Sequence, residues 1–143
     1  MAIKLLYGQD EFIKKWVSEK IGFPEFGPAV AIGIELDGKL IAGIVYHNYI
    51  ESPSGKPIMC EVSMAAIDKR WANRYTLKQI FSYPFIDLGV ERLQVSTPVE
   101  SKGVRIINEK LGFTYEGTGR KAHFLGGDVW VLSMLKQECK WIK

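Results

Sequence analysis

The chain has 143 residues, of which 47% are hydrophobic and 24% charged, a composition typical of one globular domain with a full core. Its net charge of +3, from 19 basic and 16 acidic residues, disfavours a nucleic-acid-binding surface. The two cysteines, Cys60 and Cys139, form no CxxC motif and indicate neither a disulfide scaffold nor a zinc site. No apolar run approaches the ~18 residues of a membrane span and no secretory leader is recognisable, so we expect a single cytoplasmic domain over residues 1–143.

The first half of the chain predicts mostly strands. We expect them at four places: residues 4–7, 29–36, 39–49 and 57–67. Asp37-Gly38 joins the second and third, and this pair is a strong hairpin signal because a type I′ turn needs positive φ at both positions. Between the first two strands, Asp10 can cap a helix, and the loop at residues 22–28 follows it. The helix has apolar residues at helical spacing: Phe12, Ile13, Trp16, Val17 and Ile21.

The second half alternates between helices and strands. A helix is expected over residues 71–88, with Pro84 kinking it or ending its first part. A second amphipathic helix is expected over residues 101–111, with Val104, Ile107 and Leu111 facing inward and Gly112 at the usual C-terminal position. The remaining strands are expected at residues 92–97, 114–116 and 128–135.

The predicted order of elements is β-α-β-β-β-α-β-α-β-β. The hairpins imply antiparallel pairing, and the β-α-β segment in the middle implies one parallel pair. We therefore expect an α+β fold with a mixed, mostly antiparallel central sheet of about six to seven strands, flanked by helices.

Three short motifs are similar to those of the GNAT superfamily of acyl-CoA-dependent N-acyltransferases. Residues 109–117 (EKLGFTYEG) resemble the EKLGF..EG passage of members that modify ribosomal proteins. Residues 85–93 resemble the F..LG..R passage from a helix into a strand, and Arg120, Asp128 and Met134 resemble the R…D…M ending. The resemblance covers the chain from about Ile32 to its end. It implies transfer of an acetyl or short acyl group from acyl-CoA to a primary amine.

Glu61 is the candidate general base. Residues 60–67 (CEVSMAAI) resemble the glutamate-bearing strand of histone-acetyltransferase members, in which the glutamate is the base. The resemblance implies that the backbone of Ala65, Ala66 and Ile67 pairs with the pantetheine arm. The chemistry fits, because an attacking amine must lose a proton and a carboxylate can take it. The alternative is that Glu61 merely occupies the solvated face of an alternating strand.

The segment that would hold the coenzyme A pyrophosphate departs from the family pattern. Trp71 and Asn73 stand where the resemblance expects glycines. Lys69, Arg70 and Arg74 place three positive charges at the expected start of a helix. The helix dipole disfavours cations there unless an anion binds, so a phosphate site is still expected. The predicted cofactor-binding residues of this segment are Lys69, Arg70, Trp71, Ala72, Asn73, Arg74 and Tyr75.

The last helix contributes two more predicted cofactor contacts, and each departs from the family. Ser101 stands where many members have asparagine, and Asn108 stands where a tyrosine often serves as general acid. Tyr115, Tyr75 or a water could replace that tyrosine, and the sequence does not choose among them. His47 and His123 have no metal-ligand spacing, and Cys60 is expected to be an ordinary buried residue.

The leading hypothesis is an N-acyltransferase that uses acetyl-CoA or another short acyl-CoA and no metal. Its acceptor is a small-molecule or peptide amine, and aromatic residues near the first helix and hairpin could line the acceptor pocket: Trp16, Phe23, Phe26, Tyr46 and Tyr49. We expect a monomer or homodimer, with no nucleic acid or membrane partner. The alternatives are a non-catalytic GNAT-like module that binds acyl-CoA or another protein, and a nucleic-acid-binding domain using Lys69, Arg70 and Arg74.

Overall fold

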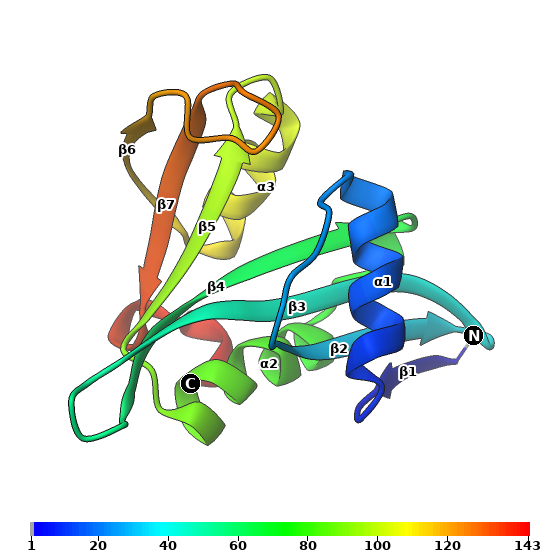
Figure 1. Ribbon diagram of the computed structural model, residues 1–143. Coiled ribbons are helices and arrows are strands. Elements are labelled where there is room, and N and C mark those ends of the chain that lie inside the picture. Colours follow the sequence, from blue (N-terminus) through cyan, green and yellow to red (C-terminus); the bar gives the residue numbers. More distant parts are fainter. Residues whose placement is uncertain (1) are drawn as a thin grey trace.

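The computed structural model describes residues 2–143, which build one seven-stranded sheet with helices on both faces (Figure 1). The strands are β1 (Ile3–Leu6), β2 (Val30–Leu36), β3 (Lys39–Glu51), β4 (Pro57–Ala66), β5 (Arg92–Pro98), β6 (Thr114–Gly119) and β7 (Val129–Leu135). The helices are α1 (Asp10–Ile21), α2 (Arg74–Ser82) and α3 (Lys102–Leu111). Short turns of helix are η1 (Lys69–Trp71), η2 (Tyr83–Leu88), η3 (Lys136–Glu138) and η4 (Lys140–Ile142).

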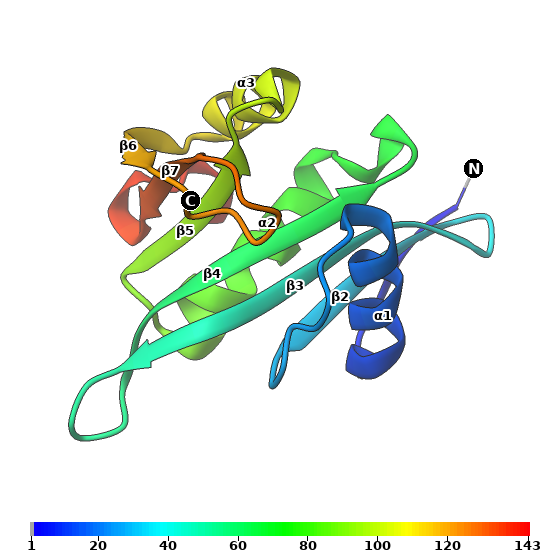
Figure 2. The ribbon, with the colours of Figure 1, turned by 45° about the horizontal axis from the view of Figure 1, so that its top comes forward.

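The strand order is β1-β2-β3-β4-β5-β7-β6, and every pair is antiparallel except β4 with β5. The predicted element order and the mixed, mostly antiparallel sheet are thus confirmed. The parallel pair is short: only Met59–Glu61 of β4 face Arg92–Gln94 of β5. Beyond that point the two strands separate, so the sheet opens like a V (Figures 1 and 2).

Helix α1 lies close against the sheet because two glycines make room for it. Gly33 and Gly43 are cross-strand partners on β2 and β3, and a Cβ on Gly43 would approach Val17 Cγ2 to 2.6 Å. The Asp37-Gly38 turn has φ values of 50° and 86°, as the hairpin prediction requires. The predicted Asp10 cap is wrong: Gln9 occupies the cap position, and Asp10 Oδ1 instead accepts a hydrogen bond from the Ala31 amide at 3.0 Å.

The opposite face of the sheet is covered by α2 and the segment after it. Leu77, Ile80 and Phe81 of α2 are buried against the larger core cluster. The expected disruption at Pro84 is confirmed, since α2 ends at Ser82 and a π-helical turn follows. A proline cannot donate the regular backbone hydrogen bond, which accounts for the change in helix type.

Helix α3 is less covered by the sheet than the prediction requires. Val104 and Ile107, expected to face inward, are 49% and 51% exposed, while Leu111 is half-buried and Asn108 is buried. Val104, Asn108 and Leu111 recur at helical spacing, so they share one side of α3. That side faces the opening between β4 and β5 at Asn108 and Leu111, which explains why an apolar helix face is left uncovered.

The C-terminal residues close the fold against its own core. Trp141 donates its indole N–H to the carbonyl of Leu111 at 2.8 Å, and Trp141 and Ile142 pack on the larger core cluster. In the described part of the chain, residues 2–143, no helix is both long and apolar enough to cross a membrane.

Candidate functional site

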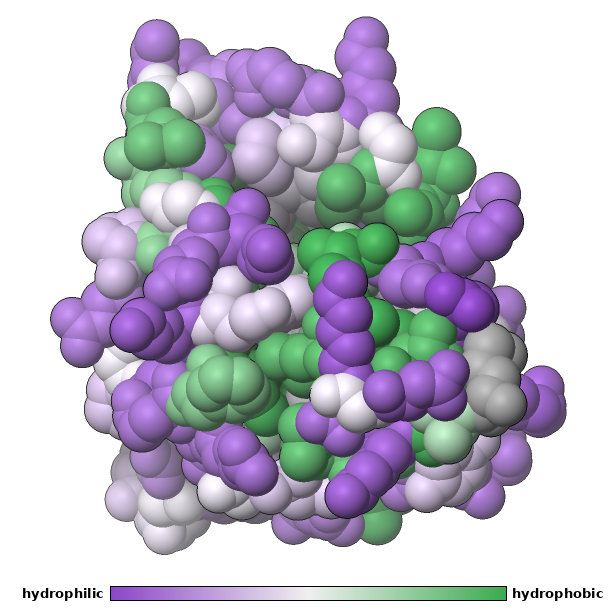
Figure 3. Space-filling model, turned by 90° about the vertical axis from the view of Figure 1, so that its right-hand side faces the viewer, coloured by the Kyte–Doolittle hydropathy of each residue, from purple (hydrophilic) through white to green (hydrophobic). Residues whose placement is uncertain are grey.

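An apolar cavity lies where β4 and β5 separate. Side chains of five elements and of Trp71 and Phe113 line it: Ile44, Tyr46, Val62, Met64, Trp71, Leu77, Ile80, Phe81, Leu93, Val95, Asn108, Leu111 and Phe113. Residues 62–66 of β4 have no strand partner on the β5 side, so backbone amide and carbonyl groups there can pair with an extended ligand. Figure 3 faces this side of the molecule and shows apolar side chains gathered around its middle, crossed by hydrophilic ones.

The side chains of β4 divide between the two faces of the sheet with a period of two. Val62 and Met64 line the cavity on the α2 face. Ala65 instead packs against a smaller core cluster on the α1 face, called the α1 cluster, which consists of Ile13, Val17, Phe26, Ala31 and Val45. Sequence reasoning chose residues 65–67 and missed Val62 and Met64. The alternation of β4 was a usable signal, because the choice of face follows once one of its residues is assigned.

Glu61 lies at the last position of β4 that still pairs with β5, opposite Gln94. Its cross-strand partner on β3 is His47, so the two side chains share the α1 face. The Asn48 side-chain amide donates to Glu61 Oε1 at 3.2 Å. The half-buried Glu61 therefore lies at the vertex of the V, where β4 and β5 part, on the face opposite Val62 and Met64.

His47 is part of this polar group, although the sequence indicated an ordinary residue. Its Nε2 is 2.8 Å from Ser63 Oγ, and only 3% of the residue is exposed. Burial lowers the pKa of His47 to about 4, with a side-chain hydrogen bond to Asn48 acting in the opposite direction. The imidazole is consequently neutral near pH 7.

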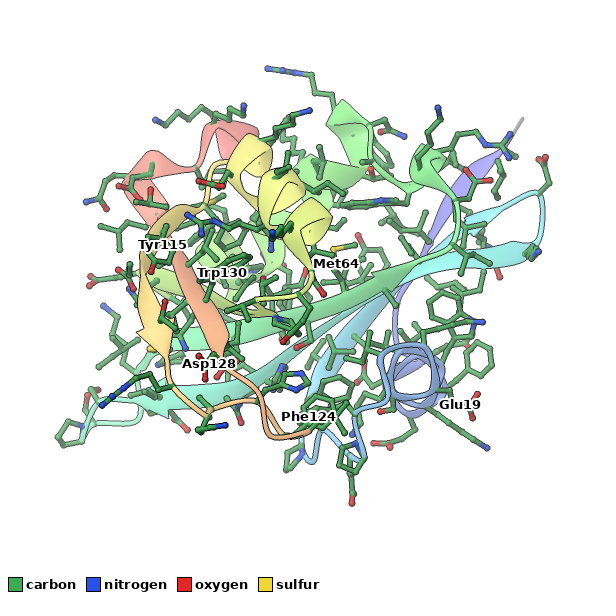
Figure 4. All side chains as sticks on the ribbon, turned by 90° about the horizontal axis from the view of Figure 1, so that it is seen from above. Glu19, Met64, Tyr115, Phe124, Asp128 and Trp130 are labelled. Carbon is green, nitrogen blue, oxygen red and sulfur yellow. The ribbon has the colours of Figure 1, made fainter. Side chains whose placement is uncertain are left out.

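Aromatic rings surround the polar group on the α1 face. The Phe26 ring meets His47 edge-on at 4.9 Å, and Phe23 stacks on Phe26 at 4.8 Å. Phe124, in the loop between β6 and β7, meets Phe23 at 4.9 Å. That loop comes from the other arm of the V and reaches over this face, where Figure 4 shows Phe124 beside the segment that follows α1. Phe23 and Phe26, two of the aromatic candidates for an acceptor pocket, thus lie in this group, and their role stays a prediction.

The other aromatic candidates do not join this group. Tyr46 points to the α2 face and donates its hydroxyl to the carbonyl of Ile80 at 2.6 Å. Tyr49 packs on the same side, and its hydroxyl donates to the Tyr46 carbonyl. Trp16 packs on the α1 cluster rather than against His47.

The start of α2 is closed by its own side chains. Asn73 Oδ1 accepts from the Thr76 amide at 2.9 Å, and Thr76 Oγ1 accepts from the Asn73 amide at 3.0 Å. Asn73 thus supplies a capping box in place of the glycines of the family loop. Arg70 pairs with Asp68, which lowers the pKa of that carboxyl to about 2, while Arg74 and Lys69 are exposed.

The structure separates the remaining predicted residues. Trp71 and Asn108 line the cavity, and Asn108 Nδ2 donates to Thr97 Oγ1 at 3.2 Å. Ser101 precedes α3 without making a side-chain cap, and Tyr75 is exposed at the start of α2. Of the residues from Lys69 to Tyr75, only Trp71 lines the cavity.

Three chemistries find little support in the arrangement: acid catalysis by Tyr115, nucleophilic attack by Cys60 and metal binding. Tyr115 shares a hydrogen bond with Thr118 at 2.9 Å and stacks on Arg105, on the outermost strand and away from the cavity. Burial raises the pKa of Cys60 to about 12, so its thiol is a poor nucleophile. Within residues 2–143 no three His, Cys, Asp or Glu side chains gather as a metal site.

Solved structures with the same arrangement are numerous. A spermidine N-acetyltransferase from Vibrio cholerae superposes with a TM-score of 0.72 at 16% identity, covering 99% of this chain and 96% of that one. The fold is that of the GNAT acetyltransferases. A ribosomal-protein-S5-alanine acetyltransferase from Vibrio fischeri matches at 0.64 and 15% identity (91% and 71% covered), and a GNAT-family acetyltransferase from Bacillus anthracis at 0.59 and 22% (76% and 67% covered).

These comparisons do not favour one subfamily of the GNAT fold. The ribosomal-protein-type protein, to which the sequence motifs pointed, superposes less well than the spermidine N-acetyltransferase. No protein-family model matches the sequence, and no curated protein matches it. At this identity the likeness concerns the fold, so the activity has to be argued from the site itself.

Proposed function

We propose that this protein is an N-acyltransferase that moves an acetyl or short acyl group from acyl-CoA to a primary amine. One observation carries the proposal: the strand that borders the V places an apolar cavity on one face and Glu61 on the other. Two substrates that must meet at one carbonyl can then approach from opposite faces. The V between β4 and β5 is where they would meet.

The reaction needs three events, and the site has a group for the first two. The amine nitrogen attacks the thioester carbonyl, a C–N bond forms, and the ammonium proton passes to Glu61 directly or through a water. Unpaired backbone N–H groups of β4 beyond Glu61 can stabilise the oxyanion that develops. The C–S bond then breaks, and the thiolate leaves without a strong acid because its conjugate thiol has a pKa of about 8.5.

The cofactor would lie along the cavity side of the V. Val62, Met64, Trp71 and Leu111 offer an apolar wall to the pantetheine arm, and the backbone at residues 65–67 can pair with its amides. Arg74 opens α2 and Lys69 and Arg70 precede it, all three exposed; since Arg70 pairs with Asp68, Arg74 and Lys69 are the cations that would meet the phosphates. Because Asn73 and Thr76 already use their amides for each other, the phosphates depend on side chains more than on a glycine loop.

The acceptor would approach on the α1 face, where Phe23 and Phe124 stand over the polar group. We infer an amine with an aromatic or apolar body, because rings line the approach and Glu61 attracts the ammonium. Some of the similar structures are spermidine N-acetyltransferases, and a linear polyamine is the contrasting acceptor.

Calorimetric titration with acetyl-CoA, followed by an assay of thiol release with a panel of amines, tests the proposal. Micromolar binding with amine-dependent thiol release is the expected result. Binding without release by any amine would favour the non-catalytic module instead. If millimolar acetyl-CoA gives no heat, the cofactor assignment is overturned as well.

A further inference from the structure

Strand β3 contains a β-bulge that begins one residue beyond the cross-strand partner of the candidate base. His47 pairs with Glu61 and Ile50 pairs with Met59, so Asn48 and Tyr49 together oppose the single residue Cys60. Asn48 has φ of 52° and is one of three non-glycine residues with positive φ within residues 2–143. An extra residue in one strand of an antiparallel pair re-aims the side chains that follow it.

The bulge changes the face to which Asn48 belongs. Tyr46 points to the α2 face and His47 to the α1 face, so a regular strand would return position 48 to the α2 face. Tyr49 takes that place instead, with its hydroxyl on the Tyr46 carbonyl and its ring on the larger core cluster. The Asn48 side chain is thereby free to reach Glu61 across the pair of strands.

We propose that Asn48 is a positioning residue whose amide, aimed by this bulge, holds the Glu61 carboxylate in the orientation that receives the proton. The inference rests on the proposed function, since it assigns a partner to the base of that reaction. Asn48 Nδ2 engages Oε1 at 3.2 Å, and within residues 2–143 no hydrogen bond occupies Oε2. One oxygen is restrained, and the other keeps its lone pairs for the proton of the attacking amine.

That residue 48 is an asparagine supports a role beyond forming the bulge. Glycine satisfies positive φ with the least strain, and Asn or Asp are the side chains that tolerate it best. The bulge alone would accept glycine, asparagine or aspartate at this position. Only asparagine among them also supplies an N–H donor to a carboxylate.

The two replacements that keep the backbone separate these roles. Asn48→Gly retains the bulge and loses the donor, and Asn48→Asp retains shape but replaces the donor with an acceptor beside Glu61. We expect kcat to fall about 10-fold in Asn48→Gly and at least as much in Asn48→Asp, with acetyl-CoA affinity unchanged. Asp37→Gly, at a positive-φ hairpin position remote from the site, should keep the wild-type kcat.

A double-mutant cycle with Glu61→Gln decides the mechanism. If Asn48 acts through the carboxylate, Asn48→Gly lowers the residual turnover of Glu61→Gln by less than 2-fold. The same 10-fold loss in both backgrounds, or wild-type kcat in Asn48→Asp at an equal melting temperature, overturns the inference while leaving Glu61 as base. Wild-type turnover in Glu61→Gln alone would overturn the base assignment first, and the positioning role with it.

Discussion

The two faces of β4 differ in kind although they belong to one strand. On the α2 face Val62 and Met64 join an apolar cavity whose walls come from both arms of the V. On the α1 face Glu61 and Ser63 form a polar group with His47 and Asn48, beneath aromatic rings. The contrast teaches that a strand losing its neighbour can present different chemistry to the space on each of its two sides, because its side chains alternate between the faces.

Replacing the Glu61 carboxylate should have the largest effect of all on turnover, and it should leave cofactor binding on the α2 face unchanged. Glu61→Gln is expected to lower kcat by about 10²–10⁴-fold, because general-base catalysis contributes that much. Acetyl-CoA affinity by calorimetry should stay within 2-fold of wild type, since the cavity lies on the other face. Glu51→Gln, an exposed carboxylate at the end of β3, is the matched control and should keep its turnover.

A charge on the open side of α3 should affect cofactor binding instead. Val104 shares the side of α3 that carries Asn108 and Leu111, so Val104→Glu should weaken acetyl-CoA binding about 10-fold through lost apolar contact and repulsion of phosphate. Ile106 is also exposed but lies about 160° away around the helix. Ile106→Glu should therefore bind as the wild type does, and equal losses in both variants would place the cofactor elsewhere.

Removing a ring from the α1 face should change the choice of acceptor. Phe124→Ala is expected to raise the KM for 2-phenylethylamine about 5-fold while leaving that for spermidine within 2-fold, because only the aryl group uses the ring. The measurement is thiol release at saturating acetyl-CoA. Phe12→Ala on the outer side of α1 serves as control. Parallel changes for both amines would exclude an aromatic acceptor site.

The smallest effect concerns stability and follows from the burial of His47. Its pKa is about 4 in the folded protein against 6.5 for the free side chain, so the unfolded state binds more protons between these values. Stability from the neutral imidazole is complete above pH 6.5 and is lost as the pH falls toward 4. Urea unfolding should show a loss of about 1 kcal/mol between pH 7 and pH 5.5. His47→Asn should remove this dependence and His123→Asn should keep it.

Local signals in the chain were sufficient for most of the architecture. Asp37-Gly38 needed positive φ at two positions, and Pro84 could not continue an α-helix, so both features appear where expected. Glu61 was selected because residues 60–67 resemble the glutamate-bearing strand of histone-acetyltransferase members, and the structure places it where β4 and β5 part. Its catalytic role stays a prediction.

Features that depend on contacts between distant segments could not be predicted. The exposure of Val104 and Ile107 on α3 is one, because both read as core residues until the opening beside them is known. The capping box of Asn73 with Thr76 differs, because its two residues are only three positions apart and the sequence carried a local signal that the expectation of a phosphate loop overlooked. The contact between Phe23 and Phe124 joins residues about a hundred positions apart.

By itself, then, the sequence determined the elements and their order, because propensity, turn chemistry and periodicity act over a few residues, and its resemblance to a known family indicated the strand that carries the candidate base. The tertiary structure decided which face each side chain of β4 serves, where β4 and β5 part, and how the Asn48 bulge meets Glu61. These depend on strand register, and register is fixed by packing across the whole sheet rather than by neighbours along the chain.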